Sequence, residues 1–382
     1  MIHDRWGGSE ELWSRTALEL VDQGVPVSVS VAAWSPLHPR VVELQESGID
    51  VWLRSQHQTL LRRAWHRFRH QSAEATQIGR LLASRSTTFV VLSDPHLPPL
   101  DLLELCVNRR VPTVTIQQAN SESWWPTDEV AQRYRQLLSG VVRCYFVSKA
   151  NRRLTERQLG IRLPNAEIVR NPFNVDFYPE LHWPALTTDS EVRFACVGRL
   201  SPIDKGQDLL FEALSHPCWA RRCWRLYLYG EGPMRDGLQR LAQSLGIANR
   251  VVFAGYRTVE QIWASNHVLV MPSRYEGLPL AMVEAMLCAR PVIATNVAGH
   301  SEIVEDGVTG FLADAPTAGS IAQALERFWA RRDNAEAIGR AGAQRIRQLV
   351  PPDPARIFAD KLMGLAGLTM PIVPARSELS PA

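Results

Sequence analysis

Short apolar runs alternate with amphipathic segments along almost the whole chain, and this alternation restricts the fold more than any other feature. Runs rich in β-branched residues and bounded by turn residues predict strands near 26–34, 88–94, 112–118 and 143–148. The amphipathic stretch 9–24 predicts a helix, with Ser9 as its N-cap and Gly24 at its end. The second half repeats this order, from VRFACVG to PVIAT. Buried-type strands joined by helices predict an α/β fold in which helices cover both faces of parallel sheets.

The length of 382 residues predicts two such domains, because a single hydrophobic core stops growing at roughly 250–300 residues. The segment 171–191 is rich in proline, asparagine and aromatic residues and shows neither the helical nor the strand periodicity of apolar residues, so we expect it to link the domains. We place one doubly wound, Rossmann-like domain at 1–178 and a second at 179–350, facing each other across a cleft at the carboxyl ends of their strands. After a proline break, 351–367 predicts a helix that crosses back to the first domain, and 368–382 predicts a disordered tail.

The first domain begins in an unusual way. Gly7 and Gly8 arrive before any strand, whereas a doubly wound domain normally has its first strand directly ahead of such a turn. Two readings stay open: either the first strand is missing from this chain, or residues 1–5 are its stub.

The composition excludes several classes of protein. Hydrophobic residues make up 46% and charged residues 21% of the chain, which is typical of globular proteins rather than of disordered or fibrous ones. No apolar stretch approaches the roughly 18–20 residues that a membrane span needs. A net charge of +3 is too small to argue for a nucleic-acid partner. The six cysteines form no CxxC pair and no zinc-spaced cluster, so we expect a reducing, cytoplasmic setting.

The first segment that carries chemistry is FACVGRLSPIDKGQDLL, residues 194–210. A buried strand ends at Gly198, and Arg199 and Lys205 flank the loop that leads to the next helix. Two cations at the carboxyl end of a strand and near a helix N-terminus suit a diphosphate. The alternative is a pair of solvated surface charges, since 39 of the 42 basic residues are arginine. The same bias leaves only three lysines, which favours a functional reading for a lysine inside a motif.

The second segment is PSRYEGLPLAMVEAMLCARPVIAT, residues 272–295, which predicts a strand end, a turn and a helix starting near Pro279. Glu276 lies in the turn and Glu284 about a turn and a half into the helix. Carboxylates at this spacing can reach different parts of one elongated ligand, and each can accept hydroxyl hydrogen bonds from a sugar or ribose. The alternative is that Glu276 caps the helix while Glu284 faces solvent. The apolar surroundings of Glu284 in the helix argue against its full exposure.

Together these segments resemble the retaining family 4 glycosyltransferases, which are group 1 glycosyltransferases of the GT-B fold. The resemblance rests on GRLSPIDKG followed by EGLPLAMVE, on YGEGPMRDGL and VVFAGY between them, and on AGHSEIVEDGVTGFL after them. GGSEELW near the start is similar to the N-terminal glycine-rich loop of the family. The resemblance is strong over about 190–350 and looser before it, and the motifs are specific only as an ordered set.

The resemblance implies roles for these residues around a nucleotide diphosphate sugar. Arg199 and Lys205 would neutralise the diphosphate as it leaves, and Glu276 would contact the donor sugar, which makes these three residues the catalytic candidates. Glu284 would hold ribose hydroxyls. The other residues expected to bind the donor are Gly7, Gly8, Gly198, Gly299, His300 and Ser301. Among them the backbone at Gly7 and Gly8 would approach the diphosphate from the first domain.

On the acceptor side the chain departs from the family pattern. Many relatives carry a histidine in the loop that here reads TIQQANSESWWP, where Gln117 and Gln118 stand instead. His96, in the preceding loop, is the nearest histidine and also fits an ordinary loop position. Trp124 and Trp125 could stack on a sugar acceptor, or at least one of them could pack inside the protein.

A basic segment, LLRRAWHRFRH at 60–70, places arginines among leucine, tryptophan and phenylalanine. Basic residues with interfacial aromatics suit a membrane surface that bears an anionic or lipid-linked acceptor. A solvated helix face is the alternative, given the arginine bias of the chain. A peripheral site at the inner face of the membrane is therefore one expectation for its location.

We therefore expect a cytoplasmic, retaining glycosyltransferase that moves a sugar from a nucleotide diphosphate sugar to a hydroxyl of a glycan or lipid-linked acceptor. Fixed cations can stabilise a diphosphate leaving group without a metal, and no DxD motif is present, so neither a metal nor a cofactor is expected. Three alternatives stay open: a non-catalytic nucleotide-sugar-binding protein, a nucleotide-sugar epimerase, and a phosphorylase, although the cofactor lysine of a phosphorylase is not evident.

Overall fold

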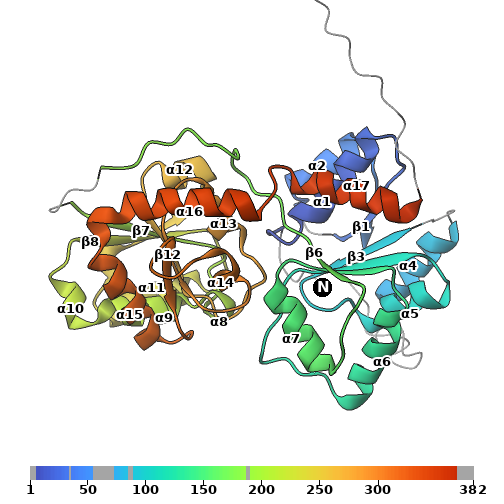
Figure 1. Cartoon of the computed structure of the whole chain (residues 1–382), viewed down its shortest axis with the longest axis horizontal. Helices are drawn as coiled ribbons and strands as arrows, with labels where there is room; N and C mark the ends of the chain where they lie inside the picture. Colours follow the sequence, from blue (N-terminus) through green and yellow to red (C-terminus); the bar gives the residue numbers. More distant parts are fainter. Residues whose placement is uncertain (1–5, 34–35, 55–72, 85–88, 186–189, 368–382) are drawn as a thin grey trace, which may run out of the picture.

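Parallel strands and their crossover helices form two α/β lobes. Figure 1 shows one lobe in blue to green, with the red last helix lying on it, and the other in yellow-green to red. The computed structural model describes residues 6–33, 36–54, 73–84, 89–185 and 190–367. The predictions for 1–5, 60–70 and 368–382 therefore lie outside the described residues. None of the helices in the described ranges is long and apolar enough to cross a membrane.

The N-terminal domain contains two parallel sheets. Strands β1 and β2 pair with each other, and a second sheet has the order β3-β4-β5-β6. The elements are α1 (Glu11–Asp22), β1 (Ser28–Ala32), α2 (Pro39–Glu46), β2 (Asp50–Arg54), α4 (Ala73–Ser84), β3 (Val90–Asp94), α5 (Leu100–Asn108), β4 (Thr113–Gln117), α6 (Asp128–Ser139), β5 (Arg143–Phe146), α7 (Lys149–Leu159) and β6 (Ala166–Ile168). Every residue of the central strand β4 is buried, as expected for a parallel strand covered on both faces.

The C-terminal domain is a six-stranded parallel sheet with the order β12-β11-β10-β7-β8-β9. Its strands are β7 (Val192–Val197), β8 (Trp224–Tyr229), β9 (Val251–Gly255), β10 (Val268–Met271), β11 (Val292–Thr295) and β12 (Gly310–Ala313). Its helices are α8 (Pro202–Lys205), α9 (Gln207–Ser215), α10 (Pro217–Ala220), α11 (Arg235–Ser244), α12 (Val259–Trp263), α13 (Leu280–Leu287), α14 (His300–Ile303), α15 (Ala318–Trp329) and α16 (Ala335–Leu349), with short 3₁₀ turns at Ala248–Arg250 and Arg332–Asn334.

This strand order reverses direction between β7 and β10, which are paired neighbours. In a doubly wound sheet the carboxyl ends of the strands at that point form the usual ligand-binding position. The predicted α/β fold with two parallel-sheet domains is confirmed, and the C-terminal sheet is doubly wound as expected. Among the described strands of the N-terminal domain, β3 to β6 follow one another in a single direction, and β1 and β2 form a separate sheet.

The start of α1 differs from the sequence prediction. Glu10, rather than Ser9, is the N-cap residue, and no side chain caps this helix. The Ser9 hydroxyl instead donates to the Glu10 carboxylate at 2.7 Å, and that carboxylate accepts the Gly7 N–H at 2.8 Å. The helix begins one residue later than the sequence predicts, so Ser9 lies outside the cap position. Gly24 does end the helical segment in a left-handed conformation, with φ of +79°.

The last helix, α17 (Pro354–Ala366), packs on α1 of the N-terminal domain, whereas α16 packs on α13 of the C-terminal domain (Figure 1). The Thr16 hydroxyl donates to the carbonyl of Ala355 at 3.3 Å. The rings of Tyr145 and Phe358 meet edge to face at 4.9 Å. The chain thus joins the two domains at the linker and again between α16 and α17.

A buried histidine in the C-terminal domain gives a prediction for stability. His267 is fully buried, and its Nδ1 accepts the Arg193 N–H at 2.9 Å. Burial lowers the pKa of His267 to about 4. In the unfolded chain the His267 imidazole takes up a proton near the ordinary histidine pKa of about 6.5. The folded protein therefore has its full free energy of unfolding above about pH 6.5 and loses part of it as the pH falls toward the folded pKa. We expect the free energy of unfolding to drop by about 2 kcal/mol between about pH 7.5 and about pH 5 through this group.

Urea unfolding at the two pH values checks this expectation. His267→Gln keeps an acceptor for the Arg193 N–H but cannot take up a proton, so its stability should change less between the two pH values. His182→Gln, at an exposed histidine, serves as the control and should keep the wild-type pH dependence. An unchanged pH dependence in His267→Gln would contradict the prediction.

Candidate functional site

The site forms where β7 and β10 end. Gly198 follows β7, Arg199 comes next, and α8 carries Lys205 at its end. Gly206 then adopts a left-handed conformation with φ of +66°, and a Cβ atom there would lie 2.0 Å from the carbonyl oxygen of Pro272. Only glycine therefore allows α8 to approach the end of β10 this closely. The result is that Lys205 reaches the turn that contains Glu276.

Lys205 and Glu276 form the central pair of the site. Lys205 Nζ lies 2.6 Å from Glu276 Oε1, and the Ser273 hydroxyl donates to the same oxygen at 2.9 Å. The two charged side chains are 22% and 10% exposed. Burial alone would lower the pKa of Lys205, but the charge and hydrogen bond of Glu276 outweigh it, so the pKa is raised. A protonated, charge-assisted lysine–carboxylate pair therefore stands at the switch point of the sheet.

Arg199 lies beside this pair and is more exposed. Its guanidinium group donates to Asp204 Oδ2 at 2.9 Å, and its side chain is 42% exposed. The loop around it is held by Arg274, which binds Asp208 through two hydrogen bonds of 2.7 and 2.8 Å. The Gln207 side chain donates to the carbonyl of Arg199 at 2.7 Å. The structure thus brings Arg199, Lys205 and Glu276 together.

Glu284 lies in a different environment from Glu276. It is buried in α13, and its Oε1 accepts both the peptide N–H and the side-chain amide of Asn174, at 3.0 and 3.1 Å. Burial raises the pKa of Glu284, while the Asn174 hydrogen bonds act against this shift. The structure therefore excludes the alternative in which Glu276 caps the helix and Glu284 faces solvent. Glu284 is buried, and α13 begins after Pro279 without a side-chain cap.

The glycine-rich turn Gly7–Gly8 at the start of α1 lies against the C-terminal domain. A Cβ atom on Gly8 would lie 3.0 Å from Leu280 Cδ1, at the first residue of α13. Gly277 of the C-terminal domain lies still closer to the N-terminal domain, because a Cβ atom there would lie 1.8 Å from the carbonyl oxygen of Gln118. The two domains therefore lie close together at both glycines.

The segment 299–301 lies next to the Glu276 turn. The Gly299 N–H donates to the carbonyl of Gly277 at 3.1 Å. His300 is fully buried, and its Nδ1 donates to the carbonyl of Thr295 at 2.7 Å. Burial lowers the pKa of His300, and its Nε2 finds no hydrogen-bond partner among the described residues. Ser301 is exposed.

The acceptor-side candidates are distributed around the loops that follow β3 and β4. His96 is exposed, and its ring lies 6.4 Å from the ring of Tyr275 in the C-terminal domain. Gln118 is buried, and its side-chain oxygen accepts from Asn171 at 2.8 Å. Its amide nitrogen finds no partner in the described part of the chain. Trp124 and Trp125 are 38% and 55% exposed, so neither is packed inside the protein.

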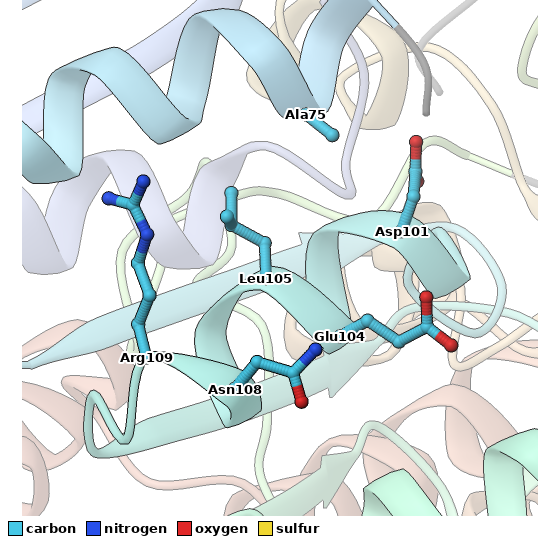
Figure 2. A pocket seen from close by; sticks show the side chains of 6 residues that line it. All are labelled: Ala75, Asp101, Glu104, Leu105, Asn108 and Arg109. Carbon is cyan, nitrogen blue, oxygen red and sulfur yellow. The ribbon is translucent and has the colours of Figure 1, made fainter. Parts of the chain in front are cut away.

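A hollow elsewhere in the N-terminal domain contains none of the predicted residues. The hollow has a volume of about 270 Å³, lies between α4 and α5, and is lined by Ala75, Asp101, Glu104, Leu105, Asn108 and Arg109. Figure 2 shows how these side chains lie. No group of three or more histidine, cysteine, aspartate or glutamate side chains in the described ranges could hold a metal ion.

Several residues of the site are not predicted by the sequence. Ser273 binds Glu276, and Asn174 binds Glu284. Glu302 accepts the Ala150 N–H of α7 at 2.8 Å and lies 3.6 Å from Arg170, which ties the two domains together. Asn174 lies in the segment that the sequence indicates only as a linker, and neither hydrophobic periodicity nor spacing distinguishes it there. Glu302 lies within the AGHSEIVEDGVTGFL segment, so its place in a motif is the one available signal.

Residues 191–331 match the family model of the group 1 glycosyl transferases. The match extends from β7 to the end of α15 in the C-terminal domain. Over 135 residues the chain is 32% identical to an α-D-kanosaminyltransferase of Streptomyces kanamyceticus, covering 35% of each protein. Over 161 residues it is 35% identical to a GDP-mannose-dependent α-(1-6)-phosphatidylinositol monomannoside mannosyltransferase of Mycobacterium tuberculosis, covering 39% of this chain and 41% of that protein. The matched segments cover less than half the length of each of these curated relatives.

Solved structures resemble both domains of the chain. The Anabaena protein HepE, in complex with UDP, has a TM-score of 0.72 at 19% identity, with 94% of this chain and 96% of that chain covered. A glycosyltransferase of Rickettsia africae has a TM-score of 0.72 at 15% identity, with 95% of each chain covered. These likenesses confirm the expected two-domain GT-B architecture.

Proposed function

We propose that the protein transfers a sugar from a nucleotide diphosphate sugar to a hydroxyl group of an acceptor. The observation that carries the proposal is the Lys205–Glu276 pair, with Arg199 beside it, at the switch point between β7 and β10. That position binds nucleotides in doubly wound sheets. The match of residues 191–331 to the family model of the group 1 glycosyl transferases supports the same donor class.

The proposed chemistry depends on charge that develops during bond cleavage. As the bond between sugar and diphosphate breaks, the sugar gains oxocarbenium character and the diphosphate gains negative charge. Lys205 is held protonated by Glu276, and Arg199 exposes its guanidinium next to it. Fixed cations of this kind stabilise a developing anion without having to reorganise. We therefore assign the leaving-group role to Arg199 and Lys205 and expect no metal or cofactor to be needed.

We also propose that the sugar is transferred with retention, by substitution on the same face of the ring. Glu276 already forms an ion pair with Lys205 and accepts a bond from Ser273, which weakens it as a nucleophile. We therefore assign Glu276 to sugar hydroxyl binding rather than to covalent catalysis.

The acceptor is proposed to be a glycan or a lipid-linked sugar. The exposed rings of Trp124 and Trp125 and the exposed His96 offer stacking and hydrogen-bonding groups for such a molecule. The mycobacterial relative is named for transfer to a phosphatidylinositol mannoside, which is a lipid-linked acceptor. We place the reaction in the cytoplasm, because all six cysteines are unpaired. Contact of residues 60–70 with a membrane surface stays a prediction.

Thermal unfolding in the presence of nucleotides tests the donor class. UDP, GDP and ADP are compared, and then the corresponding sugars of the best one. A nucleotide present at about 100 times its Kd should stabilise the protein by about 2.7 kcal/mol, and one base should stand out. If none of the three raises the unfolding temperature, the proposed function is wrong.

Turnover separates an enzyme from a binding protein. The selected donor is incubated with glycan and lipid-linked acceptors, and release of nucleoside diphosphate is followed. NMR of the product reports whether the anomeric configuration is retained. Binding without release or transfer would favour a non-catalytic nucleotide-sugar-binding protein, and interconversion of the donor sugar would favour an epimerase.

A further inference from the structure

Asn174, in the segment that joins the domains, binds one oxygen of Glu284. Its peptide N–H and its side-chain amide donate to Glu284 Oε1 at 3.0 and 3.1 Å. The second oxygen of Glu284 accepts no hydrogen bond from the residues that the structure describes. Glu284 has an exposed fraction of 6%, so this carboxylate is held in one orientation inside the protein.

Asn174 is itself held by the N-terminal domain. Its side-chain oxygen accepts a hydrogen bond from Arg15 Nη2, and Arg15 Nη1 donates to the carbonyl of Phe173 at 3.2 Å. Arg15 Nε donates to Glu11 Oε2 at 2.9 Å, at the start of α1. A continuous path of hydrogen bonds therefore runs from the helix that begins after Gly7 and Gly8 to the carboxylate of Glu284.

We propose that Asn174 and Arg15 are positioning residues for ribose recognition. By occupying Oε1, Asn174 leaves Oε2 of Glu284 as the oxygen that accepts a ribose hydroxyl. Arg15 fixes the Asn174 amide and so connects ribose binding to the glycine-rich turn of the other domain. This inference rests on the proposed function, because it assumes that a nucleoside diphosphate binds at this site.

The physical basis is the scarcity of partners for a buried carboxylate. Buried charges need hydrogen bonds, and a bond to a charged group is stronger than one between neutral groups. Asn174→Ala keeps the peptide N–H but removes the side-chain donor, so the carboxylate can rotate and Oε2 loses its fixed direction. The effect should then fall on the ribose hydroxyls rather than on the whole nucleotide.

The test compares ribose with deoxyribose nucleotides. The probe is whichever of UDP, GDP and ADP binds best, together with its 2′-deoxy and 3′-deoxy counterparts, and isothermal titration calorimetry gives the Kd values. The wild-type protein should prefer the ribose form over at least one deoxy form. In Asn174→Ala this ratio should fall about tenfold, as expected for loss of one hydrogen bond to a charged group. The Kd for the deoxy form should stay close to the wild-type value.

Two further variants show whether Asn174 acts through Glu284. In a Glu284→Gln background, Asn174→Ala should no longer change the ratio, because the group that it positions is already altered. Asn174→Leu removes the same side-chain donor at similar size and adds no charge beside Glu284, so it replaces Asn174→Ala if that variant does not fold. Asn249→Ala, at an exposed asparagine of the C-terminal domain, is the control and should leave all Kd values unchanged.

The outcomes separate the inference from the function on which it rests. The inference is supported if Asn174→Ala lowers the preference for the ribose nucleotide over its deoxy form, and if this effect disappears in the Glu284→Gln background. An equal loss of affinity for ribose and deoxyribose forms overturns it, since that result would indicate a general structural role for Asn174. A wild-type ratio in Asn174→Ala also overturns it and leaves the proposed function intact. If the wild-type protein binds no nucleoside diphosphate, the proposed function fails and the inference fails with it.

Discussion

Replacing Lys205 with alanine is expected to lower the rate of donor turnover by about 10³-fold. Loss of a single neutral donor to a developing oxyanion already costs about 10²–10³ in kcat, and Lys205 supplies a full positive charge. The substitution also leaves Glu276 buried without its counter-ion, 2.6 Å from where the ammonium group stood. The ammonium group no longer holds this carboxylate in place, so the sugar contact assigned to Glu276 should weaken as well. Release of nucleoside diphosphate from the selected donor measures the effect.

The chain offers a matched control for this prediction. Lys361 in α17 is one of only three lysines and is also paired with a glutamate, Glu167, but its side chain is 38% exposed. Exposed ion pairs contribute little to stability, so Lys361→Ala should turn over donor at close to the wild-type rate. Circular dichroism and urea unfolding establish that Lys205→Ala is folded. A folded Lys205→Ala protein that turns over donor like the wild type would show that the leaving-group role is misassigned.

The arrangement of Arg199, Lys205 and Glu276 could be anticipated from the sequence because it follows from sheet topology. Each residue lies just beyond a strand of buried type, and the carboxyl ends of parallel strands meet at one edge of the sheet. The direct contact of Lys205 with Glu276 could not be anticipated. It requires Gly206 to bring α8 against Pro272, and a glycine that follows a lysine is equally compatible with an ordinary helix end.

The two glutamates of the second motif show a different limit. Their spacing indicates that both can bind ligand hydroxyls, but it does not reveal what each contacts in the protein. Glu276 meets a lysine from the same domain, whereas Glu284 meets Asn174, 110 residues away in sequence. The second contact depends on how the linker passes over α13, and no local pattern in the sequence encodes that path. For the same reason, the sequence does not identify Gly277 and Glu302 as residues of the domain interface.

Replacing Gly277 with alanine is expected to lower kcat/KM by about 10²-fold while both domains stay folded. A Cβ atom at this position would lie 1.8 Å from the carbonyl oxygen of Gln118 and 2.7 Å from Val147 Cγ2, both in the N-terminal domain. The backbone that follows β4 cannot yield as a flexible side chain would, so the two domains must separate at this point by at least about 1 Å. Misplacement of reacting groups by about 1 Å costs on the order of 10²-fold in rate.

The clash at Gly277 lies beside the catalytic candidates, so it should affect catalysis in particular. Gly277 follows directly after Glu276, whose carbonyl accepts the Asn120 N–H at 3.5 Å. Separation of the domains at this point therefore moves the catalytic candidates of one domain away from the acceptor loop of the other. Gly237→Ala in α11 is the control, because a Cβ there meets no atom within 4 Å, and a glycine-to-alanine change within a helix should add up to about 1 kcal/mol of stability without affecting turnover. Small-angle X-ray scattering of the donor-bound protein should detect a larger radius of gyration in Gly277→Ala than in either Gly237→Ala or the wild type. Full activity in Gly277→Ala would mean that catalysis takes place in an arrangement of the domains more open than the one in which Gly277 meets Gln118.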